Sequence, residues 1–188
     1  MKNLKTLLCI LLTGSLLAAS CKKSKPGAAL TELEKLPPIT QTGANTFGCL
    51  VDGKAWLPNG SKPQIGGPNI QVYVDPTFQG GAFYVTGHQY QGPYQTVAFG
   101  SSRCVNAGFF TTDSMFNSFD YKKTINGGTS IEFRTPENGI YRKGFFNISR
   151  YDLINGVFSG TFEVKLYKTD GSFGDTLRIT NGRFDVKL

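Results

Sequence analysis

The clearest hydrophobic pattern in the chain lies near its C-terminal end, at residues 157–167. Apolar side chains and one glycine share one face of this stretch: Phe158, Gly160, Phe162, Val164 and Leu166. Polar side chains alternate with them on the other face: Ser159, Thr161, Glu163 and Lys165. A period of two residues with one apolar face indicates an antiparallel strand that is buried on one side only.

A second strand is predicted to return beside the first after a turn at residues 168–174. Its inward positions change phase at Asn181-Gly182, being odd-numbered before this pair and even-numbered after it. Asn-Gly can close a tight hairpin, or it can form a bulge that inserts one extra residue into a long strand. Residues 156–167 are one fewer than residues 175–187, as one bulge requires, so we favour the bulge.

The rest of the body alternates over shorter stretches, which are separated by turns rich in glycine, proline and asparagine. Residues 46–57 predict a hairpin that turns at Asp52-Gly53, a favoured two-residue turn. Further strands are expected at residues 70–75, 82–90, 94–100, 119–125, 129–135 and 140–151, whereas residues 108–119 are ambiguous. No long stretch of the body has helical periodicity. The pattern predicts an all-β fold, a single antiparallel β-sandwich or barrel-like domain over residues 44–188.

Aromatic side chains are expected in two environments. Alternation places six phenylalanines in the core: Phe47, Phe83, Phe99, Phe133, Phe162 and Phe184. Other aromatic residues fall on polar faces or near loops: Trp56, Tyr73, Tyr84, Tyr90 and Tyr94. Exposed rings of this kind stack on sugars or on a protein partner, so these five are candidate ligand-binding residues. The alternative is that the tyrosines flank the core and their hydroxyls reach water.

The N-terminus has the layout of a secretory signal peptide. Lys2 and Lys5 precede an apolar run at residues 7–17, which is too short to span a bilayer. The segment that follows, residues 17–21 (LAASC), resembles the lipobox of bacterial lipoproteins. The resemblance implies a signal peptide at residues 1–20, cleavage between Ser20 and Cys21, and lipid chains on Cys21 that anchor the protein in a membrane. The alternative is an ordinary secreted protein with a chance cysteine near the cut.

The residues after Cys21 bear on sorting and on reach. Lys22 and Lys23 stand where an aspartate would favour retention in the inner membrane. The acidic run that resembles a surface-export signal of Bacteroidota does not follow them. By resemblance to known sorting rules, we expect an outer-membrane lipoprotein that faces the periplasm. Residues 21–43 contain three prolines and two glycines that break regular structure, so we expect a flexible tether, with at most a marginal helical turn at residues 30–36.

Charge argues against nucleic acid as a partner. The chain has a net charge of +7, but the body from Ala44 onward holds fourteen Lys/Arg and eleven Asp/Glu, a net charge of +3. That is ordinary for a soluble domain, and export would also separate it from nucleic acid.

Two cysteines remain in the body, Cys49 and Cys104, and both lie beside predicted strands. In an oxidising compartment they are candidates for one disulfide, which would contribute about 2–4 kcal/mol. The alternative is that they are buried thiols that pack as small hydrophobic side chains. The sequence alone leaves both alternatives open.

Three segments carry a family resemblance beyond the signal peptide: residues 46–56 (TFGCLVDGKAW), 158–162 (FSGTF) and 179–185 (ITNGRFD). Together with Cys21 they resemble uncharacterised lipoproteins of Bacteroidota, and the resemblance covers both ends of the body. It implies a small β domain on a lipid anchor. Those families have no established reaction, so the resemblance assigns no catalytic residues.

The sequence offers little material for catalysis or cofactor binding. His88 is the only histidine, and its surroundings lack a nucleophile elbow, so we expect a partly exposed strand histidine. One histidine and two cysteines are too few for a zinc site, and no calcium-loop pattern is present. A glycosidase needs two opposed carboxylates, and the sequence cannot place a pair among Asp113, Asp120, Glu132, Glu137 and Asp152.

We therefore expect no enzyme activity, no metal and no cofactor. The expected function is a binding or accessory module for envelope glycan or protein. A glycosidase-like hydrolase of envelope or dietary polymers and a purely structural envelope component are the alternatives. The first predicts exposed aromatic residues with a polar rim, the second two carboxylates across a groove, and the third a flat surface.

Overall fold

The computed structural model describes residues 29–62, 66–125, 128–136, 143–170 and 174–188. Within these ranges the chain is all-β and forms eleven strands: β1 (Thr46–Val51), β2 (Lys54–Trp56), β3 (Ile70–Asp75), β4 (Ala82–Gln89), β5 (Gln95–Ser101), β6 (Gly108–Thr111), β7 (Asn117–Thr124), β8 (Ser130–Arg134), β9 (Lys143–Asp152), β10 (Val157–Lys168) and β11 (Thr176–Lys187). The ambiguous stretch at residues 108–119 contains β6 and the start of β7.

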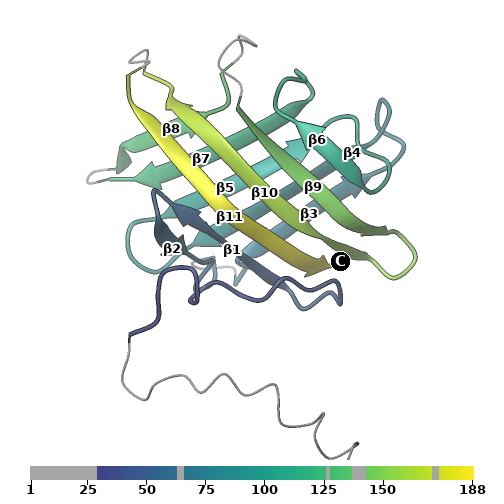
Figure 1. The fold of residues 1–188 in the computed structure, drawn as a ribbon, viewed down its shortest axis with the longest axis horizontal. Helices are drawn as coiled ribbons and strands as arrows, with labels where there is room; N and C mark the ends of the chain where they lie inside the picture. The colour runs from purple at the N-terminus through teal and green to yellow at the C-terminus, as the bar shows by residue number, and fades with distance from the viewer. Residues whose placement is uncertain (1–28, 63–65, 126–127, 137–142, 171–173) are drawn as a thin grey trace, which may run out of the picture. The chain divides into compact units, whose positions relative to one another are not determined.

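The strands form one antiparallel sheet that folds over itself into two layers. The main path runs β2-β1-β11-β10-β8-β7-β5-β4-β3, and β9 lies beside β10 with β6 at its edge. Figure 1 shows β1, β11, β10 and β9 in a front layer and β8, β7, β5, β4 and β3 behind them. The layers join where the last residues of β10, Tyr167 and Lys168, pair with Arg134 and Phe133 of β8. The end strands β2 and β3 do not pair with each other in the described part of the chain, so the architecture is an open, sandwich-like one rather than a closed barrel.

Phenylalanine rings fill the space between the two layers. Phe99 of β5 lies at the centre, with ring centroids 4.6–6.4 Å from those of five neighbours: Phe47, Phe119, Phe146, Phe162 and Phe184. Five of the six phenylalanines predicted for the core are buried, and Phe133 packs against the core while partly exposed. Each fully buried ring contributes about 1.5–3 kcal/mol relative to an exposed one, so this cluster is the main source of stability.

The predicted turn and bulge are both confirmed. Asp52 and Gly53 have φ angles of 47° and 79°, as a tight hairpin turn with two left-handed residues requires. In the β10–β11 pair, Phe162 is opposite Gly182 and Val164 is opposite Ile179, so β11 carries an extra residue at this point. Asn181, in the bulge, has a φ of 53°, a conformation that asparagine tolerates better than most residues.

The expectation of a flexible tether is wrong for its second half. Residues 31–188 form one compact unit, which includes the second half of the predicted tether. The helical turn predicted at residues 30–36 exists as a single capped turn. The Thr31 hydroxyl accepts a hydrogen bond from the Glu34 amide, and the Glu34 carboxylate accepts one from the Thr31 amide. Leu36 is buried, and a Cβ at Gly48 of β1 would lie 2.8 Å from Pro37 Cδ. Residues 31–43, from here on called the leader, therefore pack on the front layer.

Asp185 of β11 holds the leader in place. Its carboxylate is 1% exposed and accepts hydrogen bonds from the Thr40 hydroxyl and from the backbone amides of Thr42, Gly43 and Ala44. The Ser159 hydroxyl of β10 donates a further bond at 2.6 Å. Burial alone would raise the pKa of Asp185, but the hydrogen bonds outweigh it and hold the pKa well below its usual range.

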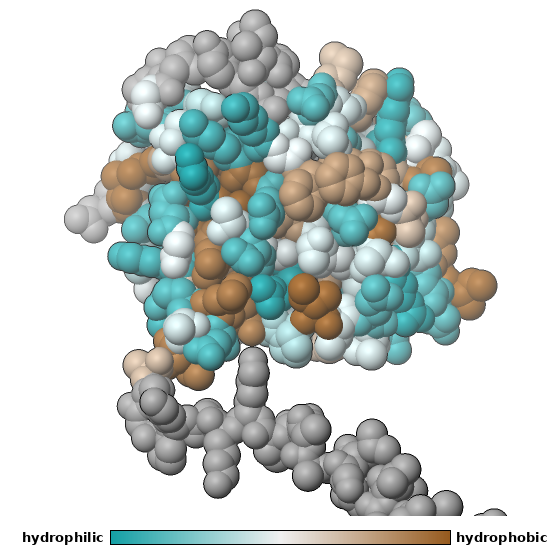
Figure 2. Space-filling view, viewed as in Figure 1, coloured by the Kyte–Doolittle hydropathy of each residue, from teal (hydrophilic) through white to brown (hydrophobic). Residues whose placement is uncertain are grey.

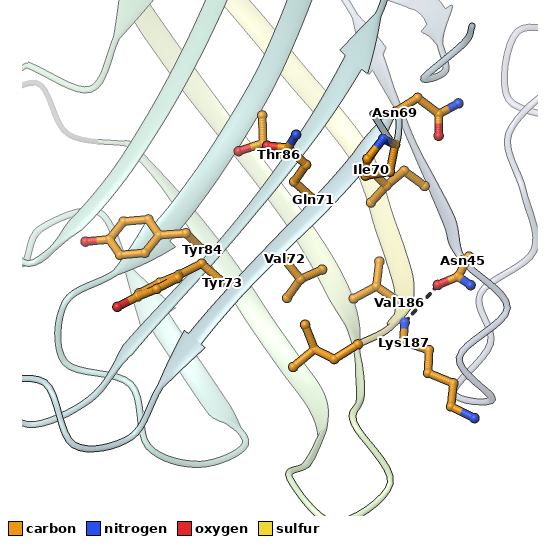
Figure 3. A pocket seen from close by; sticks show the side chains of 12 residues that line it. Asn45, Asn69, Ile70, Gln71, Val72, Tyr73, Tyr84, Thr86, Val186 and Lys187 are labelled. Atoms are coloured by element: carbon orange, nitrogen blue, oxygen red, sulfur yellow. Dashed lines mark hydrogen bonds between the residues drawn. The ribbon is translucent and has the colours of Figure 1, made fainter. Parts of the chain in front are cut away.

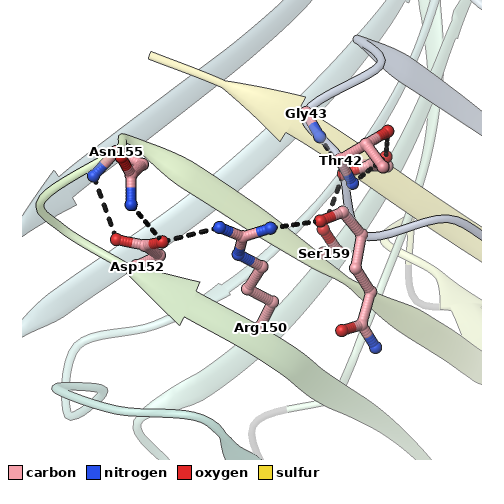
Figure 4. Close-up of polar contacts among 8 residues, drawn as sticks. Thr42, Gly43, Arg150, Asp152, Asn155 and Ser159 are labelled. Atoms are coloured by element: carbon pink, nitrogen blue, oxygen red, sulfur yellow. Dashed lines mark hydrogen bonds and ion pairs between the residues drawn. The ribbon is translucent and has the colours of Figure 1, made fainter.

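Two arginines fasten the same segment from outside. Arg183 donates to the Pro37 carbonyl at 3.2 Å, and Arg150 donates to the Gln41 carbonyl. Figure 4 shows Arg150 between the leader and Asp152, whose carboxylate also accepts from Asn155. The domain thus begins near Thr31, thirteen residues before the predicted boundary.

Candidate functional site

The best candidate for a binding site is the outer side of β3 and β4, at the edge of the back layer. Tyr73 and Tyr84 are directly opposite each other on these strands, and so are Gln71 and Thr86. The two tyrosines are 53% and 36% exposed, and their ring centroids lie 6.4 Å apart. Figure 3 shows the two rings side by side, with Gln71 and Thr86 farther along the strands. This places an aromatic surface next to amide and hydroxyl groups.

A groove runs beside this surface along the edge of β3, with a volume of about 630 Å³. Asn69, Gln71 and Thr86 line it with polar side chains, and Ile70 and Val72 supply apolar surface. The end of β11 and the loop before β1 form the opposite wall, where Asn45 Oδ1 accepts the Lys187 amide at 2.9 Å (Figure 3). A groove of this size can hold several sugar rings or a drug-sized ligand.

The free edge of β3 adds backbone groups to the groove. In the described part of the chain β3 pairs only with β4, and the His88 amide donates to the Asn69 carbonyl. Because hydrogen-bonding direction alternates along an antiparallel strand, Gln71 and Tyr73 also face β4, and the N–H and C=O groups of Ile70 and Val72 face the groove. These groups can donate to and accept from a ligand.

Two neighbours set the position and chemistry of the tyrosines. Gly100 of β5 is opposite Tyr84, and a Cβ at Gly100 would clash with the Tyr84 ring and with the Phe83 carbonyl, so only glycine leaves room for the ring. The Tyr73 hydroxyl donates to the Asp75 carboxylate at 3.3 Å. Partial desolvation and the nearby charge of Asp75 raise the pKa of Tyr73, so its hydroxyl stays protonated at neutral pH.

The other aromatic candidates do not join this surface. Trp56 is 4% exposed and meets the Phe47 ring edge-on at 5.9 Å, so its prediction as a ligand-binding residue is wrong. Trp56 is buried because β2 folds its inward face over the core, and its indole N–H has no partner among the described residues. Alternation over three residues was too short to reveal this.

Tyr90 and Tyr94 form a separate cluster with His88. The three rings are stacked with centroids 5.4–6.1 Å apart, and both tyrosines are half-buried. His88 is 8% exposed, which corrects the expectation of a partly exposed histidine. Its Nδ1 lies 3.0 Å from the Tyr94 hydroxyl, while its buried Nε2 has no partner among the described residues. Burial, and then the charge of Lys62, lowers the pKa of His88.

Cys49 and Cys104 are free thiols in the structure and do not form the candidate disulfide. Cys49 is opposite Trp56, whose ring reaches Gly87, whereas the Cys104 amide donates to the Gly81 carbonyl. Gly87 lies in β4 and Gly81 just before it, six residues or about 20 Å apart along the extended chain, so the two thiols pack near opposite ends of β4. Burial raises the pKa of Cys104 to about 11 and that of Cys49 still further, so both stay protonated.

Two of the carboxylates considered for hydrolysis are neighbours on the outer side of the back layer. Arg134 lies between them, with Nε 2.9 Å from Asp120 and Nη2 3.1 Å from Glu132. Burial raises the pKa of Asp120, and Lys122 lowers that of Glu132. Because the Arg134 guanidinium binds both carboxylates, Asp120, Arg134 and Glu132 form an ion-pair network on the sheet surface. The two carboxylates do not face each other across a groove. Glu137 lies outside the described residues.

Comparison with known proteins gives no relative: no family model matches the chain, and no curated protein or solved structure is similar to it. Within the described residues there is no cluster of His, Cys, Asp or Glu suited to a metal ion. No helix in that part of the chain is long and apolar enough to cross a membrane. Cys21 and the predicted signal peptide lie outside the described residues.

Proposed function

We propose that this protein is a lipid-anchored module of the bacterial cell envelope that binds glycan, without catalysing a reaction, in the groove beside Tyr73 and Tyr84. The observation that carries the proposal is the exposed tyrosine pair next to a groove lined by amides and a hydroxyl. Sugar rings present C–H groups that stack on aromatic rings, and their hydroxyls pair with amide side chains and backbone groups.

The lining of the groove favours binding over hydrolysis. Among the described residues that line it, none is an aspartate or glutamate, and Lys187 has the only charged side chain. A glycosidase would need two carboxylates about 5–10 Å apart on either side of the bound sugar. The lining is therefore suited to holding a neutral polymer.

Anchoring rests on the sequence features of residues 1–21, with the outer membrane as the expected location and the periplasm as the expected side. The ten residues from Cys21 to Thr31 span at most about 35 Å, so lipid on Cys21 would keep the domain close to the membrane. An anchored module that retains envelope polysaccharide near the membrane, for a partner protein to act on, is the role that fits these features.

The test is a glycan array probed with the chain from Cys21 to Leu188, carrying Cys21→Ser so that it is soluble without lipid. We expect binding to neutral oligosaccharides and a loss of at least tenfold in affinity in the Tyr73→Ala/Tyr84→Ala variant. Phe109→Ala, which removes an exposed ring from the other layer, is the matched control and should bind normally. An array without hits, or equal binding by both variants, would contradict the proposal.

A further inference from the structure

The outer side of the front layer carries three cations in one row. Lys143 of β9 is directly opposite Lys165 of β10, and Lys165 is directly opposite Arg178 of β11. Residues that pair in this way project from the same face of a sheet, at the strand spacing of about 4.8 Å. The three side chains line a shallow groove of about 310 Å³.

This cation row (Lys143, Lys165 and Arg178) has no counter-ion among the described residues. None of the three side chains makes an ion pair with a described residue, and the only charge-related contact in the row is Lys165 above the Tyr167 ring, at 5.2 Å. Like charges that face each other across strands destabilise a sheet. The row thus lowers stability without an internal compensation, which is typical of a site kept for an external anion.

Two carboxylates border the row, and each already binds the backbone. Glu163 Oε1 accepts from the Asn181 amide at 3.2 Å, and Asp52 Oδ1 accepts from the Arg178 amide at 2.8 Å. They reduce the positive charge around the groove and leave it net positive. Neither occupies the ammonium or guanidinium groups of the row.

An aromatic pair adjoins the cation row. Phe109 of β6 and Phe145 of β9 are stacked, with ring centroids 4.9 Å apart and planes 24° apart, and Phe109 is 63% exposed. Phe145 also lines the groove of the row. Figure 2 shows that this side of the molecule carries hydrophobic side chains among hydrophilic ones. An exposed stacked pair beside unpaired cations suits a ligand that is both flat-faced and anionic.

We propose that the cation row and the Phe109–Phe145 pair form a second binding site, which takes a polysaccharide that carries carboxylates. The row runs across the strands with one cation every strand spacing, about 4.8 Å, comparable to the length of one sugar. An extended acidic peptide repeats its side chains on one face only every two residues, about 6.8 Å, and fits the row less well. A sugar ring stacks on Phe109 while its carboxylates meet the cations. The site lies on the opposite layer from the Tyr73–Tyr84 pair and does not depend on the function proposed for that pair.

The test is calorimetric titration of the Cys21→Ser chain with polygalacturonate and with the same polymer after methyl esterification, which removes its charge. In the Tyr73→Ala/Tyr84→Ala background, which removes the tyrosine pair of the other groove, we expect binding of the acid form only, weakening steeply as salt is raised. Lys165→Gln/Arg178→Gln should lose at least tenfold in affinity, and Phe109→Ala several-fold. Lys123→Gln, which removes a half-buried lysine from the back layer, and Tyr73→Ala/Tyr84→Ala should bind the acid polymer normally.

Several results would overturn the proposal. Equal binding of the esterified polymer in the Tyr73→Ala/Tyr84→Ala background would show that the cations do not recognise the carboxylates, and equal loss in Lys123→Gln would show only general electrostatic attraction. Equal or tighter binding of polyglutamate, or of vesicles containing phosphatidylglycerol, would reassign the site to an acidic protein or to a membrane. A lower melting temperature in Lys165→Gln/Arg178→Gln would give the row a structural role.

Discussion

Strand β11 carries two charged sites seven residues apart that differ in every physical respect. Asp185 is buried, and its carboxylate accepts hydrogen bonds from the leader and from Ser159. Arg178 is exposed, and its guanidinium stands in a row of like charges without an ion pair in the described chain. The Asp185 carboxylate therefore stabilises the fold, whereas the Arg178 guanidinium is exposed to solvent and lowers stability.

The largest effect is expected at the buried charge. Asp185→Ala leaves the Ser159 hydroxyl and several leader amides without acceptors, so the free energy of unfolding should fall by about 3 kcal/mol or more. Urea denaturation followed by circular dichroism measures it. Asp152→Ala removes a carboxylate whose partners among the described residues are Arg150 and Asn155 at a turn, and it should cost much less than Asp185→Ala. A loss of stability in Asp185→Ala no greater than that in Asp152→Ala would contradict the role of Asp185 in holding the leader in place.

The same carboxylate predicts a pH dependence. Because the pKa of Asp185 is lower in the folded state than in the unfolded chain, its contribution is complete above the unfolded value of about 3.9 and is lost as pH falls toward the folded one. Wild-type stability should thus decline more steeply below pH about 4 than that of Asp185→Asn, which has no charge to lose. Parallel curves for the two proteins would contradict this prediction.

His88 is expected to act at a higher pH. Its folded pKa is lowered, so the unfolded chain binds the proton first, and stability should fall as pH drops below the unfolded value of about 6.5. The thermal midpoint of His88→Gln should change less than that of the wild type between pH 7 and pH 5. If the wild type is equally stable across this range, the buried and unpartnered Nε2 has no effect on stability.

The smallest effect tests the other half of the comparison. Lys165→Gln removes the middle charge of the row and should raise the free energy of unfolding by about 0.2–1 kcal/mol, because two like-charge contacts disappear. Lys122→Gln removes a lysine that is paired with Glu132 at 2.8 Å, and should instead lower it slightly. Changes of opposite sign in the free energy of unfolding would confirm that the cation row lowers stability. Changes of the same sign would contradict it.

Much of the fold is predictable from local patterns. The alternation of β10, the Asp52-Gly53 turn and the bulge at Asn181 each depend on residues close together in the chain, and all three are confirmed. The packed leader is not predictable in this way, because Thr40 and Thr42 meet Asp185 across more than 140 residues. In the sequence, prolines in a polar segment indicate a flexible tether as well as they indicate a packed segment.

The candidate sites likewise divide into those that local patterns predict and those that depend on contacts between distant residues. Tyr73 and Tyr84 could be predicted because their strands alternate cleanly, and both are exposed. Trp56 could not, since a three-residue strand has too little pattern to assign a face. The Phe109–Phe145 pair and the cation row depend on which strands pair, and the only sequence signal was a Phe109-Phe110 pair among polar residues.

The most direct test of the central claim, that the groove beside Tyr73 and Tyr84 binds glycan, is an amide NMR titration of the Cys21→Ser chain with the strongest oligosaccharide from the array. We predict that saturable shifts concentrate at Asn69–Tyr73, at Tyr84–Thr86 and at residues 186–188, and disappear in Tyr73→Ala/Tyr84→Ala. Shifts confined to the front layer, or unchanged in that variant, would contradict the account.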